Sequence, residues 1–213
     1  MTAAERLEAL GRRFARLATR VTVARPLLWR LFRGPLRVQF DRLAPVWEAR
    51  RGPEALAPLV AALDRLEREP KRALDLGTGT GKGARVVAER FPEAEVIGVD
   101  LAPRMVTEAR RLLPPDLAGR VRFEVADASA LPFPDGAFDL VVLLNMIPFF
   151  DELARVTAPG GLVAFFFNDT ATTEIYTQHE VLREKLAAVG FTSFEALAAG
   201  EGDALLARKG APG

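Results

Sequence analysis

Apolar and polar positions alternate in two different ways along the chain, and the change falls near residue 71. Residues 4–20 place apolar side chains at three- and four-residue steps with arginines between them, a spacing that predicts an amphipathic helix. Pro26 opens a second apolar and arginine-rich stretch, which we expect to be interrupted at Gly34-Pro35. Gly52-Pro53 then begins a third helix, because proline suits the first helical turn. The apolar face of the first helix would hold Leu7, Leu10, Phe14 and Leu17, and that of the third Leu56, Leu59, Val60, Leu63 and Leu66.

From Lys71 onward, short apolar runs alternate with helical segments. We expect strands at 72–77, 94–100, 120–126, 138–145 and 161–167, and helices near 81–91, 103–112, 149–156 and 179–189. Apolar strands that alternate with helices indicate a parallel sheet covered on both faces. After a helix end at Gly190, the stretches 191–198 and 203–208 predict an antiparallel hairpin. The chain is therefore expected to comprise a basic helical extension or lid, residues 1–70, and an α/β domain, residues 71–213.

The candidate chemistry begins in residues 73–83, ALDLGTGTGKG, where an apolar strand runs into a glycine-rich turn. Glycines let the backbone take positive φ and let a ligand approach closely, and exposed amides at a helix start favour an anion. Such a turn alone is weak evidence, because nicotinamide- and flavin-binding folds also use one. Asp75 favours a ligand with an ammonium group, since it would repel a pyrophosphate. Lys82 stands where the third glycine of G-x-G-x-x-G would be, counted from Gly77.

An acid closes the next predicted strand, EVIGVD, residues 95–100. Asp100 occupies the position where a carboxylate grips ribose hydroxyls, which supports an adenosine-type ligand without choosing between cofactors. Leu101 and Met105 could flank an adenine ring, although packing of a helix explains Met105 slightly better.

Polar residues also follow the third and fourth predicted strands. Asp127 could accept a hydrogen bond from an adenine amino group, with the Ala128 amide pairing to a ring nitrogen. Asp139 fits support of a turn or helix better than chemistry. The apolar run VVLLN ends at Asn145, and a sharp turn at Pro159-Gly160-Gly161 leads into the next strand.

Together these motifs resemble the class I S-adenosylmethionine-dependent methyltransferases, especially the broad group similar to the quinone-biosynthesis enzymes. The D-x-G-x-G-x-G turn, the acid after the second strand, the D-A-x-x-L-P-F-P-D-G-x-F-D run and the P-G-G turn stand in this order within residues 72–164. The resemblance implies a Rossmann-like α/β fold, with a seven-stranded sheet that is mostly parallel and has an antiparallel C-terminal strand, beside the N-terminal helices. It also implies methyltransferase activity with S-adenosyl-L-methionine as the cofactor.

The resemblance assigns a part of that cofactor to each motif. The ligand would lie beyond the C-terminal ends of the strands, as expected for an open α/β sheet. By the same resemblance, the cofactor-binding residues would be Asp75, Gly77, Thr78, Gly79 and Gly81 for the methionine part, Asp100 for the ribose, Leu101, Met105, Asp127 and Ala128 around the adenine, and Asn145 near the methyl donor.

Composition narrows the chemistry further. The chain has no cysteine and one histidine, His179, which excludes thiolate chemistry and a multi-histidine metal site. No general base stands out, because capping or simple exposure explains His179 better than catalysis does. The acceptor is expected to be a small molecule, lipophilic or aromatic, since apolar residues follow Asn145; core packing explains those residues equally well. These residues are Met146, Ile147, Phe149 and Phe150.

Charge is unevenly distributed, although the formal net charge is only +1. Residues 1–51 hold twelve arginines against four acids, a net charge of about +8 that leaves about −7 for the rest of the chain. A helical cap paired with the acidic domain is the simpler interpretation, with Phe40 and Trp47 as parts of a lid. Peripheral membrane contact through residues 1–51 is the other, with Trp29 and Phe32 at the lipid interface. No stretch has the length of a membrane span or the pattern of a signal peptide, so we expect a cytoplasmic protein.

Three alternatives to a small-molecule methyltransferase can be weighed on the sequence. A nicotinamide-dependent oxidoreductase would need a turn without Asp75 and a proton-transfer residue such as a Tyr-Lys pair. Nucleic-acid amino-methyltransferases have a [D/N]-P-P-[Y/F/W] motif after the fourth strand, whereas this chain reads NMIPF at 145–149, so nucleic acid is an unlikely partner. A non-catalytic membrane-surface or protein-binding module would rest on the basic segment alone.

Residues 165–177, FFFNDTATTEIYT, raise a separate hypothesis. Residues 168–177 are the translation of a widely used sequencing-adaptor oligonucleotide (AAT GAT ACG GCG ACC ACC GAG ATC TAC AC), and a preceding poly-T linker would encode the three phenylalanines. The only tyrosine of the chain, Tyr176, falls here. The other interpretation is a native strand and polar loop, because Phe165–Phe167 continue a plausible buried strand. We favour an adaptor sequence that replaced the native strand end and loop.

Overall fold

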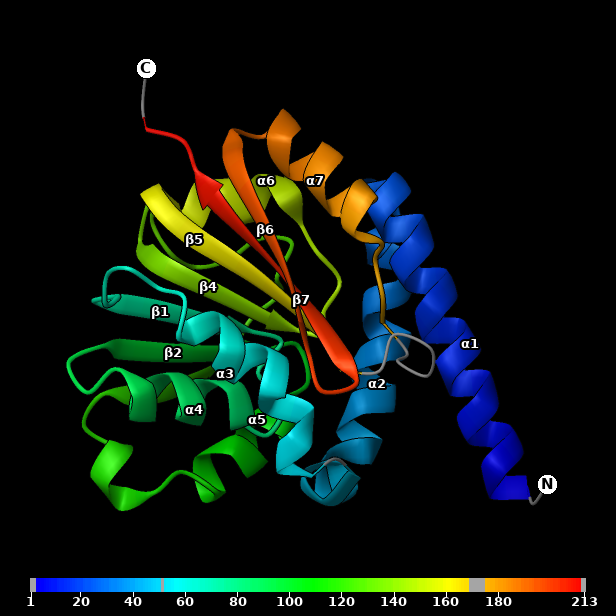
Figure 1. The fold of residues 1–213 in the computed structure, drawn as a ribbon. Coiled ribbons are helices and arrows are strands. Elements are labelled where there is room, and N and C mark those ends of the chain that lie inside the picture. Colours follow the sequence, from blue (N-terminus) through cyan, green and yellow to red (C-terminus); the bar gives the residue numbers. More distant parts are fainter. Residues whose placement is uncertain (1–2, 51, 169–174, 212–213) are drawn as a thin grey trace.

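The molecule is built on one twisted sheet with helices on both faces (Figure 1). The computed structural model describes residues 3–50, 52–168 and 175–211. Within these residues the strand order is β3-β2-β1-β4-β5-β7-β6. The strands are β1 (Arg72–Leu76), β2 (Glu95–Asp100), β3 (Val121–Val125), β4 (Phe138–Leu144), β5 (Thr157–Phe167), β6 (Phe191–Ala199) and β7 (Gly202–Lys209).

The pairing directions confirm the fold class predicted from the sequence. β1 pairs in parallel with β2 and β4, and the parallel pairing continues to β3 on one side and to β5 on the other. β7 is antiparallel to both of its neighbours, β5 and β6. The predicted hairpin therefore exists, and it inserts its second strand between β5 and β6. The chain order changes direction between β1 and β4, which is the place where open α/β sheets bind ligands.

Alternate residues of each strand enter two different cores. Phe165 and Phe167 pack into one apolar cluster, whereas Phe166 between them packs into the other. All three side chains are at most 1% exposed. Successive strand side chains point to opposite faces, so a strand that is buried on both sides must be apolar throughout. Burial on both faces therefore explains the uninterrupted apolar runs in the sequence.

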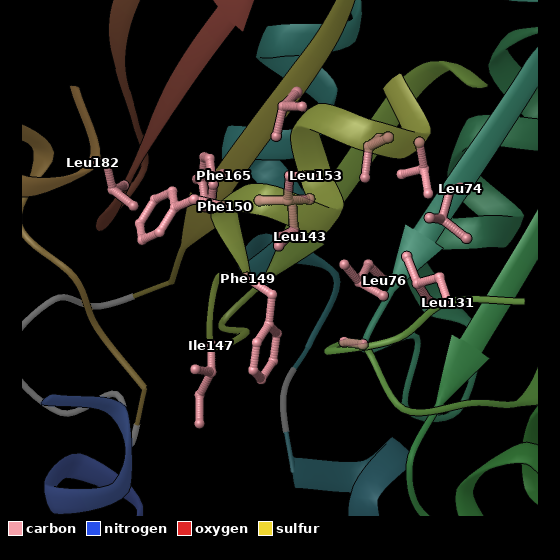
Figure 2. Close-up of a cluster of buried hydrophobic side chains, with 14 of the residues drawn as sticks. Leu74, Leu76, Leu131, Leu143, Ile147, Phe149, Phe150, Leu153, Phe165 and Leu182 are labelled. Atoms are coloured by element: carbon pink, nitrogen blue, oxygen red, sulfur yellow. The ribbon is translucent and has the colours of Figure 1, made fainter. Parts of the chain in front are cut away.

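Each face of the sheet has its own set of helices (Figure 1). One core lies under α3 (Ala57–Leu63), α4 (Lys82–Arg90) and α5 (Pro103–Arg111). The other lies under α6 (Phe150–Val156) and α7 (His179–Ala188), and it also receives residues of the two N-terminal helices. Figure 2 shows the second core around Phe150, Leu153 and Phe165, with Leu182 of α7 reaching it from the side. Short 3-10 turns complete the described elements at η1 (Pro26–Leu28), η2 (Glu48–Arg50), η3 (Pro53–Leu56) and η4 (Pro115–Leu117).

The N-terminal segment is more regular than the sequence predicts. α1 (Ala3–Ala24) is followed by η1 and by α2 (Trp29–Trp47), which continues through Pro35 and Pro45. The interruption expected at Gly34-Pro35 was therefore wrong. Proline removes one helical hydrogen bond, but most helical stability in proteins comes from packing of a buried face. In α2 that face consists of Trp29, Leu36 and Ala44.

Two predicted apolar faces are also wrong in part. Leu10 and Leu17 are 60% and 54% exposed, because α1 buries its small residues Ala15 and Ala18 instead. Leu7 was placed on the same face, and its side chain lies outside the described residues. Val60 in α3 is exposed, while Leu59 and Leu63 of the predicted face are buried. Residue volume explains the first error, since close approach of α1 to its neighbours requires small side chains that a count of large apolar residues overlooks.

Among the described residues, no helix combines the length and apolar character that a membrane span requires.

Candidate functional site

The glycine-rich turn after β1 forms the floor of the candidate site. The amides of Gly77 and Thr78 both donate to the carbonyl of Val99 at 2.9 Å, which ties the turn to the end of β2. Gly79 has a φ of +54°, and a Cβ there would lie 3.0 Å from Nε1 of Trp47. The turn then ends at Gly81, whose left-handed conformation starts α4. Glycine is needed in this turn because a side chain at position 79 would meet Trp47.

Asp75 organises this turn from below. Its Oδ2 accepts from the hydroxyl of Thr78 at 2.6 Å and from the amide of Ala84 at 2.7 Å, so the carboxylate caps the start of α4. The residue is 1% exposed, and burial raises the pKa of Asp75 from the ordinary 3.8 to about 6, against the lowering effect of these two hydrogen bonds. A carboxylate buried so deeply near a ligand cavity is a mark of a functional position.

Asp100 is held by backbone amides on both carboxylate oxygens. Oδ2 accepts from Gly79 at 2.9 Å, and Oδ1 accepts from Ala102 at 2.8 Å. Burial raises the pKa of Asp100 to about 6, although these hydrogen bonds lower it. The side chain therefore links the glycine turn to the start of α5, with a fixed orientation at the mouth of the site.

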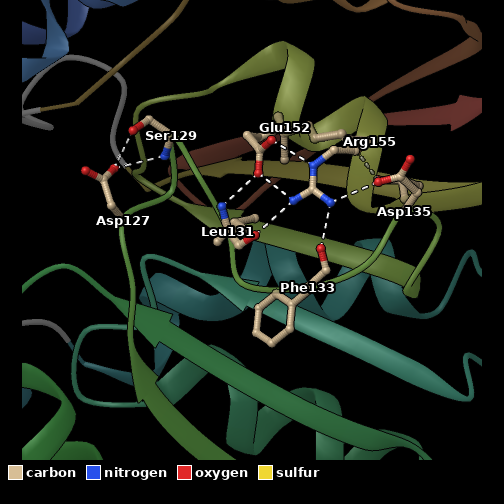
Figure 3. Close-up of polar contacts among 9 residues, drawn as sticks. Asp127, Ser129, Leu131, Phe133, Asp135, Glu152 and Arg155 are labelled. Atoms are coloured by element: carbon tan, nitrogen blue, oxygen red, sulfur yellow. Dashed lines mark hydrogen bonds and ion pairs between the residues drawn. The ribbon is translucent and has the colours of Figure 1, made fainter.

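The loop between β3 and β4 carries the third candidate acid, Asp127, and Arg155 of α6 holds the rest of this loop (Figure 3). The guanidinium donates to the carbonyls of Phe133 and Leu131 at 2.6 and 3.0 Å and to Glu152 at 2.8 Å. Glu152 in turn accepts from the amide of Leu131 at 2.8 Å. One arginine fork thus joins two loop carbonyls to a carboxylate and ties the loop to α6.

Asp127 itself contacts the N-terminal segment. Its Oδ1 accepts from Nε1 of Trp29 at 2.8 Å and from the amide and hydroxyl of Ser129 at 2.9 and 2.7 Å, and Arg33 lies 3.5 Å from Oδ2. Burial opposes the charge, but these hydrogen bonds outweigh it and lower the pKa of Asp127. The carboxylate is thus ionised, and Trp29 and Arg33 of α2 already contact it.

A cavity of about 120 Å³ joins these parts at the C-terminal ends of β1, β2 and β4. Nine of the eleven residues predicted to bind the cofactor line it: Asp75, Gly77, Thr78, Gly79, Asp100, Leu101, Met105, Ala128 and Asn145. Gly81 and Asp127 do not line it. A Cβ at Gly81 would lie 2.6 Å from Phe123, so this glycine is required by packing of the turn on β3. Asp127 lies next to the lining residue Ala128 and is engaged by Trp29.

Residues 73–161 match the model of the family described as "Methyltransferase domain". These residues carry the features of a class I S-adenosylmethionine-dependent methyltransferase domain. A demethylmenaquinone methyltransferase of Thermus thermophilus is 53% identical over 104 residues, which are 45% of this chain and 46% of that protein. A malonyl-[acyl-carrier protein] O-methyltransferase of Halorhodospira halophila is 41% identical over 139 residues, 62% of this chain and 44% of that protein. The chain thus spans about half the length of the curated relatives it matches.

Solved structures support the same fold. A chain from the complex of the Haloferax volcanii Trm112 methyltransferase activator with a methyltransferase superposes with a TM-score of 0.68 and 20% identity. The match covers 80% of this chain and 97% of that one. The comparisons give the alternatives, an oxidoreductase or a non-catalytic module, no support.

The N-terminal segment supplies a wall of the methyltransferase pocket that the sequence indicated only in part. Trp29 and Leu36 line the cavity beside Phe40 and Trp47, the two residues expected in a lid. The rings of Phe40 and Trp47 meet edge to face at 5.7 Å. Trp29 and Leu36 were not among the predicted site residues, because their apolar spacing in a helix is equally typical of core positions.

The end of the segment also holds the glycine turn. Glu48, which follows α2, accepts a hydrogen bond from the hydroxyl of Thr80. It also accepts one from Nη2 of Arg85, at 2.9 Å. Its carbonyl accepts from Nζ of Lys82 at 2.7 Å, and Lys82 lines the cavity. The sequence offered one signal for this contact, the charge difference between residues 1–51 and the rest of the chain. It did not identify the partners.

Asn145 has the one positive φ of a non-glycine residue in the described chain, +49°. It lines the cavity, its amide donates to the carbonyl of Phe166 at 2.9 Å, and its Oδ1 accepts from the amide of Asn168 at 3.2 Å. Such strain often marks a functional position, because the surrounding structure must hold it in place.

Two polar residues outside the cavity have structural roles. Asp139 accepts from the amides of Lys71 and Arg72 at 2.9 and 3.0 Å, so its role is structural, at the start of strand β1 and not at the turn or helix that was expected. His179 begins α7, but its Nε2 lies 3.0 Å from Oδ1 of Asp203 in β7, so the expectation of capping or simple exposure was wrong. Sequence could not predict this pair, because the partner lies in a strand that follows later in the chain.

Proposed function

We propose that this protein transfers the methyl group of S-adenosyl-L-methionine to a small lipophilic or aromatic acceptor. The observation that carries the proposal is one cavity in which the glycine turn, Asp100 and Ala128 face an apolar wall from α2. Polar groups at one side and an apolar wall at the other suit a site for a polar cofactor and an apolar second substrate.

The residues present fit the cofactor. The glycines let two cavity-lining side chains pack on the turn, since a Cβ at Gly79 would lie 3.0 Å from Nε1 of Trp47 and one at Gly77 would lie 2.7 Å from Sδ of Met146. Asp75 keeps its second oxygen, Oδ1, beside this turn, where it suits an ammonium group. By the family resemblance, Asp100 would accept from hydroxyl donors and the amide of Ala128 would donate to a ring nitrogen, and both residues line the cavity. These are the same roles that the family resemblance assigns to these residues.

The acceptor is inferred from the charge of the lining residues. Lys82 is the one cationic side chain among them, and its Nζ donates to the carbonyl of Glu48. Recognition of a carboxylate or phosphate commonly uses arginine forks or several lysines. The apolar lining residues Leu36, Phe40 and Ile147 instead favour an uncharged ring or chain. This chemistry agrees with the quinone named for the Thermus thermophilus relative better than with the malonyl group named for the Halorhodospira halophila relative.

The chemistry assigned to the protein is mainly alignment. When bound, the cofactor supplies a methyl group that is already activated as a sulfonium. The chain contributes a fixed turn, a fixed loop held by Arg155 and an apolar wall that excludes water. Orientation of this kind can account for about 7–11 kcal/mol of a barrier in ideal cases. The pocket residues provide no histidine, so we expect an acceptor whose reacting atom ionises readily.

The organisation and location of the protein are part of the same proposal. Residues 1–70 would act as a basic lid and residues 71–213 as the S-adenosylmethionine-binding domain. We further propose a cytoplasmic protein that makes peripheral membrane contact through residues 1–51. The charge of this segment, about +8, supports the contact with an anionic surface.

Calorimetric titration with S-adenosyl-L-methionine tests the central proposal, with NAD as the control ligand. We expect saturable binding of the first and none of the second. Asp100→Asn should weaken binding at least about tenfold, because a ribose contact to a carboxylate is a charge-assisted hydrogen bond. Asp116→Asn, at an exposed aspartate in η4, should bind as the wild type does. A folded protein that binds NAD, or that binds neither ligand, would contradict the proposal.

A further inference from the structure

Large apolar side chains are exposed on α1, on η1 and at the start of α2. Eight large apolar residues are exposed in the described chain, and six of them fall between residues 10 and 46. The four leucines among them, 54–85% exposed, are Leu10, Leu17, Leu27 and Leu31. Scattered exposed apolar residues are ordinary, but a concentration in one segment marks an interaction surface. We refer to these four residues as the leucine face.

Exposed arginines accompany the leucines in each of these elements. Arg13 and Arg20 are exposed and stand three residues after Leu10 and Leu17, so all four lie along one side of α1. Arg25 and Arg30 are exposed on either side of Leu27. None of these four arginines forms an ion pair with another described residue. No acidic residue occurs between Glu8 and Asp41.

The opposite side of the same segment is fixed in the fold. Ala15, Ala18, Thr19 and Thr22 of α1 are at most 1% exposed, and Trp29 at the start of α2 is 6% exposed. The leucine face is therefore held outward by a packed inner face. Figure 1 shows α1 as an elongated element at the edge of the molecule, against α2.

We propose that the leucine face and its four arginines dock on the surface of an anionic membrane. A helix with apolar residues and arginines on one side lies in the interface, with the leucines among the acyl chains and the guanidinium groups at the phosphates. Nucleic acid would explain the arginines but leaves the leucines exposed. A second copy of this face would bring two arginine-rich surfaces together, which repel.

This docking surface rests on the membrane contact proposed above and changes which residues make it. Trp29 and Phe32 were expected at the lipid interface, but Trp29 lines the pocket and Phe32 packs against Phe14 at 5.9 Å. The leucine face thus lies on the outer side of the segment whose inner side forms the pocket wall. A lipophilic acceptor could then reach the pocket from the bilayer through the same segment.

Co-sedimentation with vesicles tests the docking surface on the full chain. Vesicles of phosphatidylcholine with phosphatidylglycerol should bind the protein at low salt, and vesicles of phosphatidylcholine alone should bind it at least about tenfold more weakly. Leu27→Ser with Leu31→Ser should reduce binding to the anionic vesicles about tenfold or more, because these side chains lose their apolar insertion. Arg25→Gln with Arg30→Gln should reduce it by about fivefold for each arginine and flatten its salt dependence.

Matched variants elsewhere on the surface control for general effects. Val60→Ser with Val125→Ser removes the two large exposed apolar residues outside residues 10–46, and Arg68→Gln with Arg104→Gln removes two exposed arginines outside residues 1–51. Both should bind vesicles as the wild type does. Equal losses in the control and test variants would overturn the proposal. So would binding of RNA, or formation of dimers, that depends on Arg25 and Arg30 while the vesicles leave the protein in solution.

Cofactor binding separates this inference from the proposed function. All of these variants should keep wild-type affinity for S-adenosyl-L-methionine, since none of the changed residues lines the pocket. Loss of vesicle binding with intact cofactor binding supports the docking surface. A wild type that binds the cofactor and ignores anionic vesicles refutes the docking surface alone. A wild type that binds vesicles through the leucine face and fails to bind the cofactor refutes the methyltransferase proposal alone.

Discussion

The buried carboxylate of Asp75 should make the protein without cofactor less stable as the pH rises. Folding raises the pKa of this group from 3.8 to about 6, so between these values the folded state holds a proton that the unfolded state has lost. The stabilisation by Asp75 is therefore complete below pH 3.8 and is lost as the pH rises through about 6. From this shift, the free energy of unfolding falls by about 3 kcal/mol between acidic pH and pH 8. About 1.4 kcal/mol of that loss occurs between pH 5 and pH 8.

Asp75→Asn isolates this effect because asparagine has the same shape and no charge. The amide oxygen can still accept from Thr78 or Ala84. Relative to the wild type, the variant should gain about 1.4 kcal/mol of unfolding free energy between pH 5 and pH 8, or about 3–6 °C in Tm for a chain of this size. Comparing the two proteins cancels the opposite pH dependence of acids whose pKa is lowered, such as Glu152.

The assay is thermal unfolding of both proteins without cofactor at pH 5, 6, 7 and 8. Asp116→Asn serves as the exposed control and should run parallel to the wild type at every pH. The variant should also bind S-adenosyl-L-methionine at least about tenfold more weakly, if Asp75 holds an ammonium group in the complex. A pH-independent difference in Tm between Asp75→Asn and wild type would refute the reasoning, because the carboxylate would then ionise as easily in the folded state as in the unfolded one.

Three further predictions concern packing around the site. Trp29→Phe keeps the ring contact with Phe149 but removes the donor to Asp127, so it should cost about 1–2 kcal/mol in urea unfolding, and an unchanged midpoint would show that this hydrogen bond contributes nothing. Arg155→Lys cannot hold the loop carbonyls in a fork, so it should cost about 2 kcal/mol and weaken cofactor binding severalfold by calorimetry; unaltered affinity would mean that the loop keeps its shape alone. Gly81→Ala should destabilise by about 1–3 kcal/mol more than Gly160→Ala, because both glycines have positive φ but only Gly81 would bring a Cβ against Phe123; equal losses would exclude the packing term.

The sheet was predictable because its sequence signals are local. Strands buried on both faces must be apolar throughout, and the runs ending at Leu76, Asp100 and Leu144 give the three central strands within a residue of the prediction. The glycine turn after β1 was predictable for the same reason, since positive φ and close packing both demand glycine. The nine predicted residues around the cavity come from these segments, because consecutive parallel strands end at one edge of the sheet.

The N-terminal segment was not predictable to the same degree, because its conformation depends on partners far along the chain. Trp29 donates to Asp127 and Glu48 contacts Thr80 and Arg85, and neither pairing has a signal in local spacing. Helix α2 passes through Pro35 because packing of its buried side stabilises the helix by more than the loss of one backbone hydrogen bond destabilises it. The amphipathic pattern of α1 gave the helix correctly and its buried face incorrectly, since alanines carry that face.

Residues 165–177 combine features of a native strand with the sequence of an adaptor. Phe165–Phe167 extend β5 and alternate between the two cores, so they agree with a native strand. The hydroxyl of Thr177 is buried without a hydrogen-bond partner among the described residues, but so is that of Thr22 in α1, so this feature does not distinguish an adaptor from a native loop. Asn168 and Ile175 line the cavity, so the acceptor pocket includes part of the segment, and residues 169–174 lie outside the described chain.

Resequencing the source DNA across these codons is the measurement that decides between a native loop and an adaptor. We expect native codons that differ from the adaptor from residue 168 onward, because ten consecutive residues match its translation. Recovery of the same codons would refute the adaptor hypothesis and make Asn168 and Ile175 genuine determinants of the acceptor. If the codons differ, restoring the native loop should leave the affinity for S-adenosyl-L-methionine within about threefold, since Asp75, Asp100 and the glycine turn belong to other segments. It should change the range of acceptors instead, because Asn168 and Ile175 line the cavity and Asn168 donates to Asn145.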